Sequence, residues 1–153
     1  MKLSLGGALL CAAVHLTACS SHEEASLISS ELIEGDALPV PLTQSIGDWD
    51  EGMQVFQSRE QGHCVLCHQI QNLNAEFQGN LGPDLTEVGS RLTPGQIRLR
   101  IIDYERVLSG VTMPSYYRIH DLNQVGDDYE NQSVLTAQQV EDLVVFLSEQ
   151  KGN

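Results

Sequence analysis

Cys64-Val65-Leu66-Cys67-His68 is the stretch of this sequence that decides its fold. Because two residues separate the thiols, a single helical turn presents both sulfurs to the two vinyl groups of one porphyrin. His68 then places an imidazole nitrogen over the porphyrin iron, and neutral imidazole is a strong axial ligand for iron. The pentapeptide therefore predicts one covalent haem c, attached through Cys64 and Cys67 and ligated by His68.

A redox-active dithiol and half of a zinc site are the competing interpretations of two cysteines at this spacing. A dithiol of the thioredoxin kind belongs to a βαβ context, and the sequence shows no strand alternation. A zinc site needs further Cys or His residues with matching spacing, which the sequence does not offer. Haem attachment is the interpretation that we prefer.

The N-terminus has the pattern of a bacterial export signal. Lys2 precedes an apolar run, residues 3–16, that is too short for a comfortable membrane span. Leu16-Thr17-Ala18-Cys19 then resembles a lipobox, which predicts that residues 1–18 are removed and that Cys19 is acylated. Ordinary cleavage after Ala18 is the alternative. We expect a periplasmic lipoprotein that is anchored to a membrane through its acyl chains only.

This processing also accounts for the four cysteines of the chain. Cys11 leaves with the signal and Cys19 carries lipid, so only Cys64 and Cys67 remain inside the folded domain. The disulfide framework that an even number of cysteines in an exported protein could indicate is therefore not expected.

The composition is acidic and poor in aromatic residues. Eight Lys+Arg against 21 Asp+Glu give a net charge of −13, which becomes −14 when Lys2 is removed with the signal. This charge argues against a nucleic-acid partner and favours a salt-sensitive encounter with a basic electron acceptor. With three Phe, four Tyr and one Trp, the chain has few large side chains to fill a core, and a prosthetic group would fill it instead.

We expect a single all-α domain at residues 47–150, preceded by a flexible tether and strap at residues 19–46. Residues 72–92 and 109–133 lack a regular period and are expected to be long loops that wrap the haem. Capping residues predict three helices. The first starts from Gly47, is capped by Asp48 or Asp50, and is ended by Gly62. The second begins at Thr93-Pro94, and the third begins at Thr136, which forms a capping box with Gln139. Gly52 and Phe56 on the first helix are expected to pack against Phe146 on the last.

The sixth ligand of the iron must come from farther along the chain. Met113 lies in an irregular loop about 45 residues after His68, where a loop can bring its sulfur to the opposite face of the haem. Met53 lies among apolar neighbours, where methionine more often fills a core, and His63 points with the proximal side. His120 is the next candidate. We predict His68/Met113 ligation, which raises the potential relative to two imidazoles and leaves no open site for a substrate.

A carbonyl group is expected to orient the proximal imidazole. An axial histidine usually donates its second ring nitrogen to a carbonyl or carboxylate. Pro83, in Leu81-Gly82-Pro83-Asp84-Leu85, offers a carbonyl on a rigid loop, and a simple turn is the alternative interpretation. We therefore predict a hydrogen bond from His68 to Pro83.

Taken together, these elements resemble class I cytochromes c, and several segments are more specifically similar to the SoxX family of monohaem cytochromes. The resemblance covers roughly residues 37–148. The strap and the Met-Pro-x-Tyr-Tyr-Arg segment are its most family-specific parts. The similar segments are residues 37–43, 88–91, 98–103, 113–118 and 135–142.

The resemblance implies a heterodimer with a SoxA-like haem subunit. Such a SoxAX complex is an L-cysteine S-thiosulfotransferase, which joins thiosulfate to a cysteine of the SoxYZ carrier and releases two electrons. The SoxX-like chain relays these electrons to a soluble cytochrome c. It would be the non-catalytic subunit, because haem attachment consumes Cys64 and Cys67 and leaves this chain no catalytic nucleophile.

Two other functions remain open at this stage. A stand-alone, membrane-tethered carrier would deliver electrons to a terminal oxidase or peroxidase without an enzymatic partner. A haem sensor or catalyst would instead need an open coordination site on the iron.

Overall fold

The computed structural model describes residues 27–152. The predicted signal, residues 1–18, and Cys19 lie outside this range. Within it the fold is all-α, as expected, and no helix is long and apolar enough to cross a membrane. The α-helices of this range are α1 (Trp49–Gln57), α2 (Val88–Arg91), α3 (Pro94–Asp103) and α4 (Ala137–Ser148), joined by the 3-10 turns η1 (Ser30–Leu32), η2 (Cys64–Leu66), η3 (Tyr104–Arg106) and η4 (Asp127–Tyr129).

The helix starts follow the local capping signals. The Thr93 hydroxyl accepts a hydrogen bond from the Gln96 N–H, and the Gln96 side chain accepts one from the Thr93 N–H, which forms the capping box of α3. Thr136 and Gln139 form the same arrangement at α4, as predicted. Such reciprocal caps satisfy backbone donors that a helix N-terminus leaves unpaired.

Two boundaries differ from the sequence-based expectation. Helix α1, capped by Asp48, ends at Gln57 and not near Gly62. Ser58 takes up an extended backbone and its carbonyl accepts a hydrogen bond from the His63 N–H, so the chain turns at once towards the attachment motif. The stretch expected to be a loop also contains α2, whose Gly89 lies against the Ser148 backbone, where any Cβ would collide.

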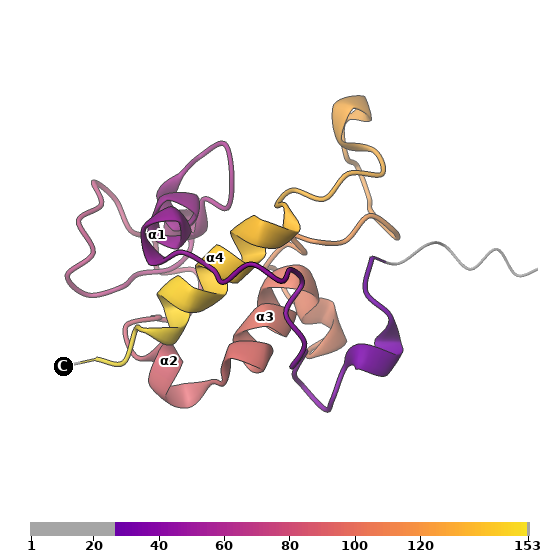
Figure 1. Cartoon of the computed structure of the whole chain (residues 1–153). Coiled ribbons are helices and arrows are strands. Elements are labelled where there is room, and N and C mark those ends of the chain that lie inside the picture. The colour runs from indigo at the N-terminus through magenta and orange to yellow at the C-terminus, as the bar shows by residue number, and fades with distance from the viewer. Residues whose placement is uncertain (1–26, 153) are drawn as a thin grey trace, which may run out of the picture.

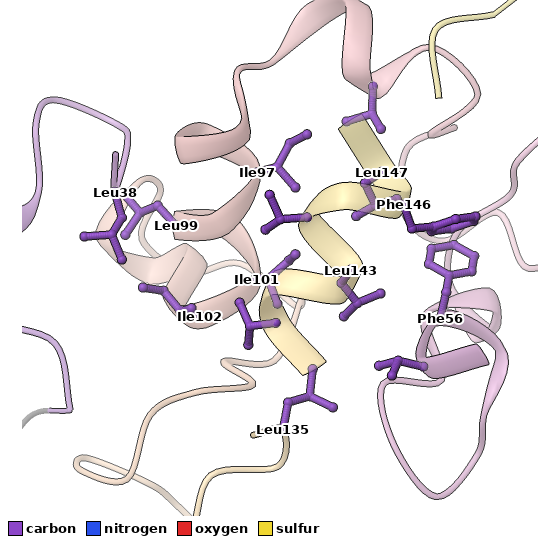
Figure 2. Close-up of a cluster of buried hydrophobic side chains, with 14 of the residues drawn as sticks. Leu38, Phe56, Ile97, Leu99, Ile101, Ile102, Leu135, Leu143, Phe146 and Leu147 are labelled. Carbon is purple, nitrogen blue, oxygen red and sulfur yellow. The ribbon is translucent and has the colours of Figure 1, made fainter. Parts of the chain in front are cut away.

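Helix α4 runs through the middle of the molecule, with α1 packed on one side of it and α3 on the other (Figure 1). Gly52 allows α1 and α4 to approach closely, because a Cβ there would lie only 2.8 Å from the Phe146 Cβ. The rings of Phe56 and Phe146 pack at a tilt of 53° with centroids 5.5 Å apart, and both side chains are fully buried (Figure 2). The packing of Gly52 and Phe56 against Phe146 is thus confirmed.

The strap before α1 is tied down by a buried ion pair. Arg98 on α3 and Glu141 on α4 meet at 2.7 Å with both side chains about 5% exposed. The Arg98 guanidinium also donates to the Leu38 carbonyl, and the Glu141 carboxylate accepts from the Leu42 N–H. In Figure 1 the strap accordingly crosses over α3 and α4 on its way to α1.

Candidate haem site

The attachment motif forms a compact turn directly after α1. Residues Cys64–Leu66 form η2, and the N–H groups of Cys67 and His68 both donate to the Cys64 carbonyl, at 3.1 and 2.9 Å. Cys64 and Cys67 are both free thiols. One helical turn therefore presents both sulfurs and the imidazole from one short segment, which is the geometry that attachment to a single porphyrin requires.

The imidazole of His68 is held by the Pro83 carbonyl. His68 Nδ1 lies 2.7 Å from the Pro83 oxygen, which confirms the predicted contact. With Nδ1 donating to this carbonyl, Nε2 carries the lone pair that can ligate iron. The Gly82 N–H in turn donates to the Cys67 carbonyl at 2.7 Å, so the Pro83 loop is fixed to the motif itself.

Where the Pro83 loop meets the imidazole of His68, the loop has no room for a side chain. A Cβ at Gly82 would lie 2.6 Å from His68 Nδ1, inside van der Waals contact. Leu66 on the attachment turn, Leu81 beside Gly82, and Phe77 in the loop between them are large apolar side chains that remain more than half exposed. An oriented imidazole, two thiols and an uncovered apolar surface fit an attached porphyrin.

The surroundings of the two thiols do not favour the zinc interpretation. A structural zinc site needs four ligands, most often Cys and His. Among residues 27–152 no group of three or more His, Cys, Asp or Glu side chains is arranged to hold a metal ion. Two cysteines without such partners suit thioether formation better than a zinc site.

The candidates for the sixth ligand occupy different surroundings. Met53 packs against the hydrophobic core, as a core-filling methionine would. His63 directly precedes η2, and the buried Nδ1 of His120 faces a small cavity beside Tyr117. Met113 is half-buried in the loop after η3 and is not part of the core. It therefore stays the predicted ligand.

Tyr116 lies three residues after Met113 and is partly buried. Like Cys64 of the attachment turn, it packs against the hydrophobic core. Burial is the main cause that raises the pKa of its phenol. The end of the Met113 loop and the attachment turn therefore rest on the same core.

Sequence reasoning missed a group of polar residues beside this loop. Asp103, at the end of α3, accepts hydrogen bonds from Ser115, Arg106 and Arg118. Ser115 and Arg118 belong to the Met-Pro-x-Tyr-Tyr-Arg segment, so that segment was a signal for the group. Asp103 ends another of the similar segments, residues 98–103, but its pairing with Ser115 and Arg118 could be identified only from the fold.

Comparison with known proteins agrees with this geometry. The cytochrome c family model matches residues 49–151. The chain therefore belongs to the cytochrome c family, whose members carry haem c and transfer electrons.

Among solved structures, the chain is similar to one in the crystal structure of SoxXA from P. pantotrophus, with 32% identity and a TM-score of 0.71, covering 77% of this chain and 92% of that one. The resemblance to SoxX-like cytochromes is thereby confirmed. A more distant likeness, on which no argument rests, is to the c-type cytochrome SorU from Sinorhizobium meliloti, with 19% identity and a TM-score of 0.45, covering 68% of this chain and 91% of that one. No curated protein matches the chain.

Proposed function

We propose that this cytochrome is the electron-transfer subunit of a SoxAX-like L-cysteine S-thiosulfotransferase. The observation that carries the proposal is the similarity to SoxXA from P. pantotrophus, which extends over 92% of the matched chain at 32% identity. In this function the chain receives the electrons released when thiosulfate is joined to a carrier cysteine, and passes them to a soluble cytochrome c.

The residues of the chain suit a relay better than a catalyst. Haem attachment through Cys64 and Cys67 leaves the described domain without a free thiol, so the cysteine chemistry belongs to a partner. The acidic surface repels a dianionic substrate such as thiosulfate. Haem c supplies a one-electron iron couple, and the protein fixes its axial ligands and its surroundings.

On the proximal side, the Pro83 carbonyl orients His68 and makes its imidazole a more basic ligand. On the distal side, Met113 would supply the thioether. With both protein ligands in place, the iron would have no open position for thiosulfate or oxygen, and the haem would serve electron transfer only. This is the coordination that a carrier needs.

Export and membrane attachment belong to the same proposal. Acylation of Cys19 would anchor the domain in the periplasm, close to the substrates and carriers of sulfur oxidation. Mass spectrometry of the mature N-terminus tests this point. The expected result is a chain that begins at a lipid-modified Cys19, and an unmodified Cys19 would refute the anchor without affecting the proposed electron transfer.

Purification of the native, tagged protein tests the enzymatic function. The expected result is a complex with a larger SoxA-like haem protein that, given the SoxYZ carrier and thiosulfate, reduces a soluble cytochrome c. A protein that elutes alone and delivers electrons to an oxidase or peroxidase would instead favour the stand-alone carrier. Ready binding of CO by the reduced native protein would favour a sensor or catalyst.

A further inference from the structure

The loop that carries Met113 has little support of its own. After the Leu108 N–H, which donates to the Tyr104 carbonyl, the next backbone hydrogen bond along the described chain is made by the Tyr116 N–H. Gly110, between them, has a positive φ of 75°, and a Cβ added there would meet no atom within 4 Å. The position of Met113 must therefore be set where the loop rejoins the helices.

The loop rejoins the helices at Ser115, beside the end of α3. The Ser115 hydroxyl donates to Asp103 Oδ1 at 2.8 Å, and the Tyr116 and Tyr117 N–H groups donate to the Ile101 and Ile102 carbonyls at 3.1 and 3.2 Å. Of these three hydrogen bonds, the one between Ser115 and Asp103 is the nearest to Met113 along the chain.

Pro114 makes the link between Ser115 and Met113 stiff. Its ring fixes its own φ near −65° and restricts the preceding residue, Met113, to extended conformations. Because the φ of Pro114 is fixed and the conformation of Met113 is restricted, fewer rotations than usual separate the two residues, so a displacement of Ser115 is passed on to the backbone of Met113. The hydrogen bond at Ser115 thus acts on the position of the thioether two residues away.

The surroundings of Asp103 keep its carboxylate, and with it Ser115, in a fixed position. Its side chain is only 8% exposed, and its two oxygens are shared among Ser115, Arg118 at 3.1 Å and Arg106 at 3.2 Å. Hydrogen bonds between charged groups are about twice as strong as neutral ones, and a buried carboxylate with two guanidinium partners has little freedom to move. Arg118 is itself held by a second carboxylate, that of Glu105.

We infer that Asp103 is a positioning residue for the Met113 ligand: it holds Ser115, and through the stiff Met113-Pro114-Ser115 link it keeps the thioether on the iron. The inference rests on the proposed ligation by Met113. It goes beyond that proposal because it assigns the stability of the distal bond to a carboxylate that does not touch the iron.

Asp103→Asn tests the inference in the ferric holoprotein. Loss of the negative charge should let the loop open more often, and cyanide, which binds only when the sixth ligand leaves, should bind about tenfold faster, the factor expected for ~1.4 kcal/mol lost from a charge-assisted hydrogen bond. The near-infrared charge-transfer band of sulfur-ligated ferric haem should weaken and the reduction potential should fall.

Glu141→Gln is the matched control, because Glu141 is also a buried carboxylate paired with an arginine but holds the strap and not the Met113 loop. It should lower the free energy of unfolding and leave the cyanide rate unchanged. If Asp103→Asn does not fold, Ser115→Ala removes only the link to the loop and should give the same acceleration.

Cyanide rates and band intensities equal to those of the wild type in the folded Asp103 or Ser115 variant would overturn the inference. Failure of the underlying ligand assignment is distinguishable, because Met113→Ala would then retain the near-infrared band whatever the state of Asp103.

Discussion

The two sides of the haem site are held in different ways. On the proximal side, residues 64–85 are tied by main-chain hydrogen bonds: the Gly79 N–H donates to the Val65 carbonyl, and the Leu85 N–H to the Gln69 carbonyl. On the distal side, residues 109–115 make no backbone hydrogen bond within the described chain, and the Asp103 carboxylate holds their end through side chains. The segment of the predicted proximal ligand, His68, is thus fixed by its own main chain, whereas the loop of the predicted distal ligand, Met113, depends on the end of helix α3.

This difference has a functional consequence. If Cys64 and Cys67 hold the haem covalently, the neighbouring His68 stays close to it, so the fold can hold the distal side with fewer contacts and still keep the cofactor. Perturbations should therefore alter the distal ligand before they disturb the proximal one. The following variants test the contrast, beginning with the largest expected effect.

Gly82→Ala should destabilise the proximal side of the haem site. The new Cβ would lie 2.6 Å from His68 Nδ1, so either the imidazole or the Pro83 loop must move. Overpacking of this kind costs about 3 kcal/mol. Chemical unfolding of the holoprotein and the yield of attached haem should both show the loss.

Gly110→Ala is the matched change on the distal side. Nothing lies within 4 Å of the added carbon, so only the positive φ of 75° opposes it. That strain costs about 1 kcal/mol, and haem attachment should be unaffected. Equal losses of stability in the two glycine variants would contradict the contrast between the two sides.

The same contrast explains what the sequence could predict. The attachment turn, the His68–Pro83 contact and the starts of α3 and α4 depend on residues close together in the chain, and the structure confirms them. The predicted end of α1 was wrong because the extended backbone of Ser58 and its local hydrogen bond from the His63 N–H end the helix early. The short helix α2 was missed because it packs against a remote segment, with Gly89 against the Ser148 backbone.

The polar groups around the site were the least predictable part. Arg98 and Glu141 are 43 residues apart, and Asp103 and Ser115 are 12 apart, and nothing in the local pattern pairs them. Only the fold reveals the ion pair that ties the strap to α4. The same holds for the pairing of the Asp103 carboxylate with the end of the Met113 loop.

Tyr116→Phe should produce the smallest effect at neutral pH, and its effect should grow only in alkali. Burial is the main cause that raises the phenol pKa in the folded protein, so the folded state favours the neutral phenol. The contribution to stability is complete below the unfolded value of 10 and is lost as the pH rises above it.

Above about pH 10, the free energy of unfolding of the wild type should fall relative to that of Tyr116→Phe, by at most ~1.4 kcal/mol per pH unit. Tyr129→Phe, at an exposed position, is the matched control. Parallel pH profiles for the wild type and Tyr116→Phe would show that the buried phenol does not couple to folding.

The near-infrared spectrum of the ferric Met113→Ala holoprotein tests the central claim, a haem c ligated by His68 and Met113, most directly. Met53→Ala serves as the control, because Met53 packs in the core. We predict that the charge-transfer band of sulfur-ligated haem is present in the wild type and in Met53→Ala and absent in Met113→Ala. A band that persists in Met113→Ala and disappears in Met53→Ala would contradict the account.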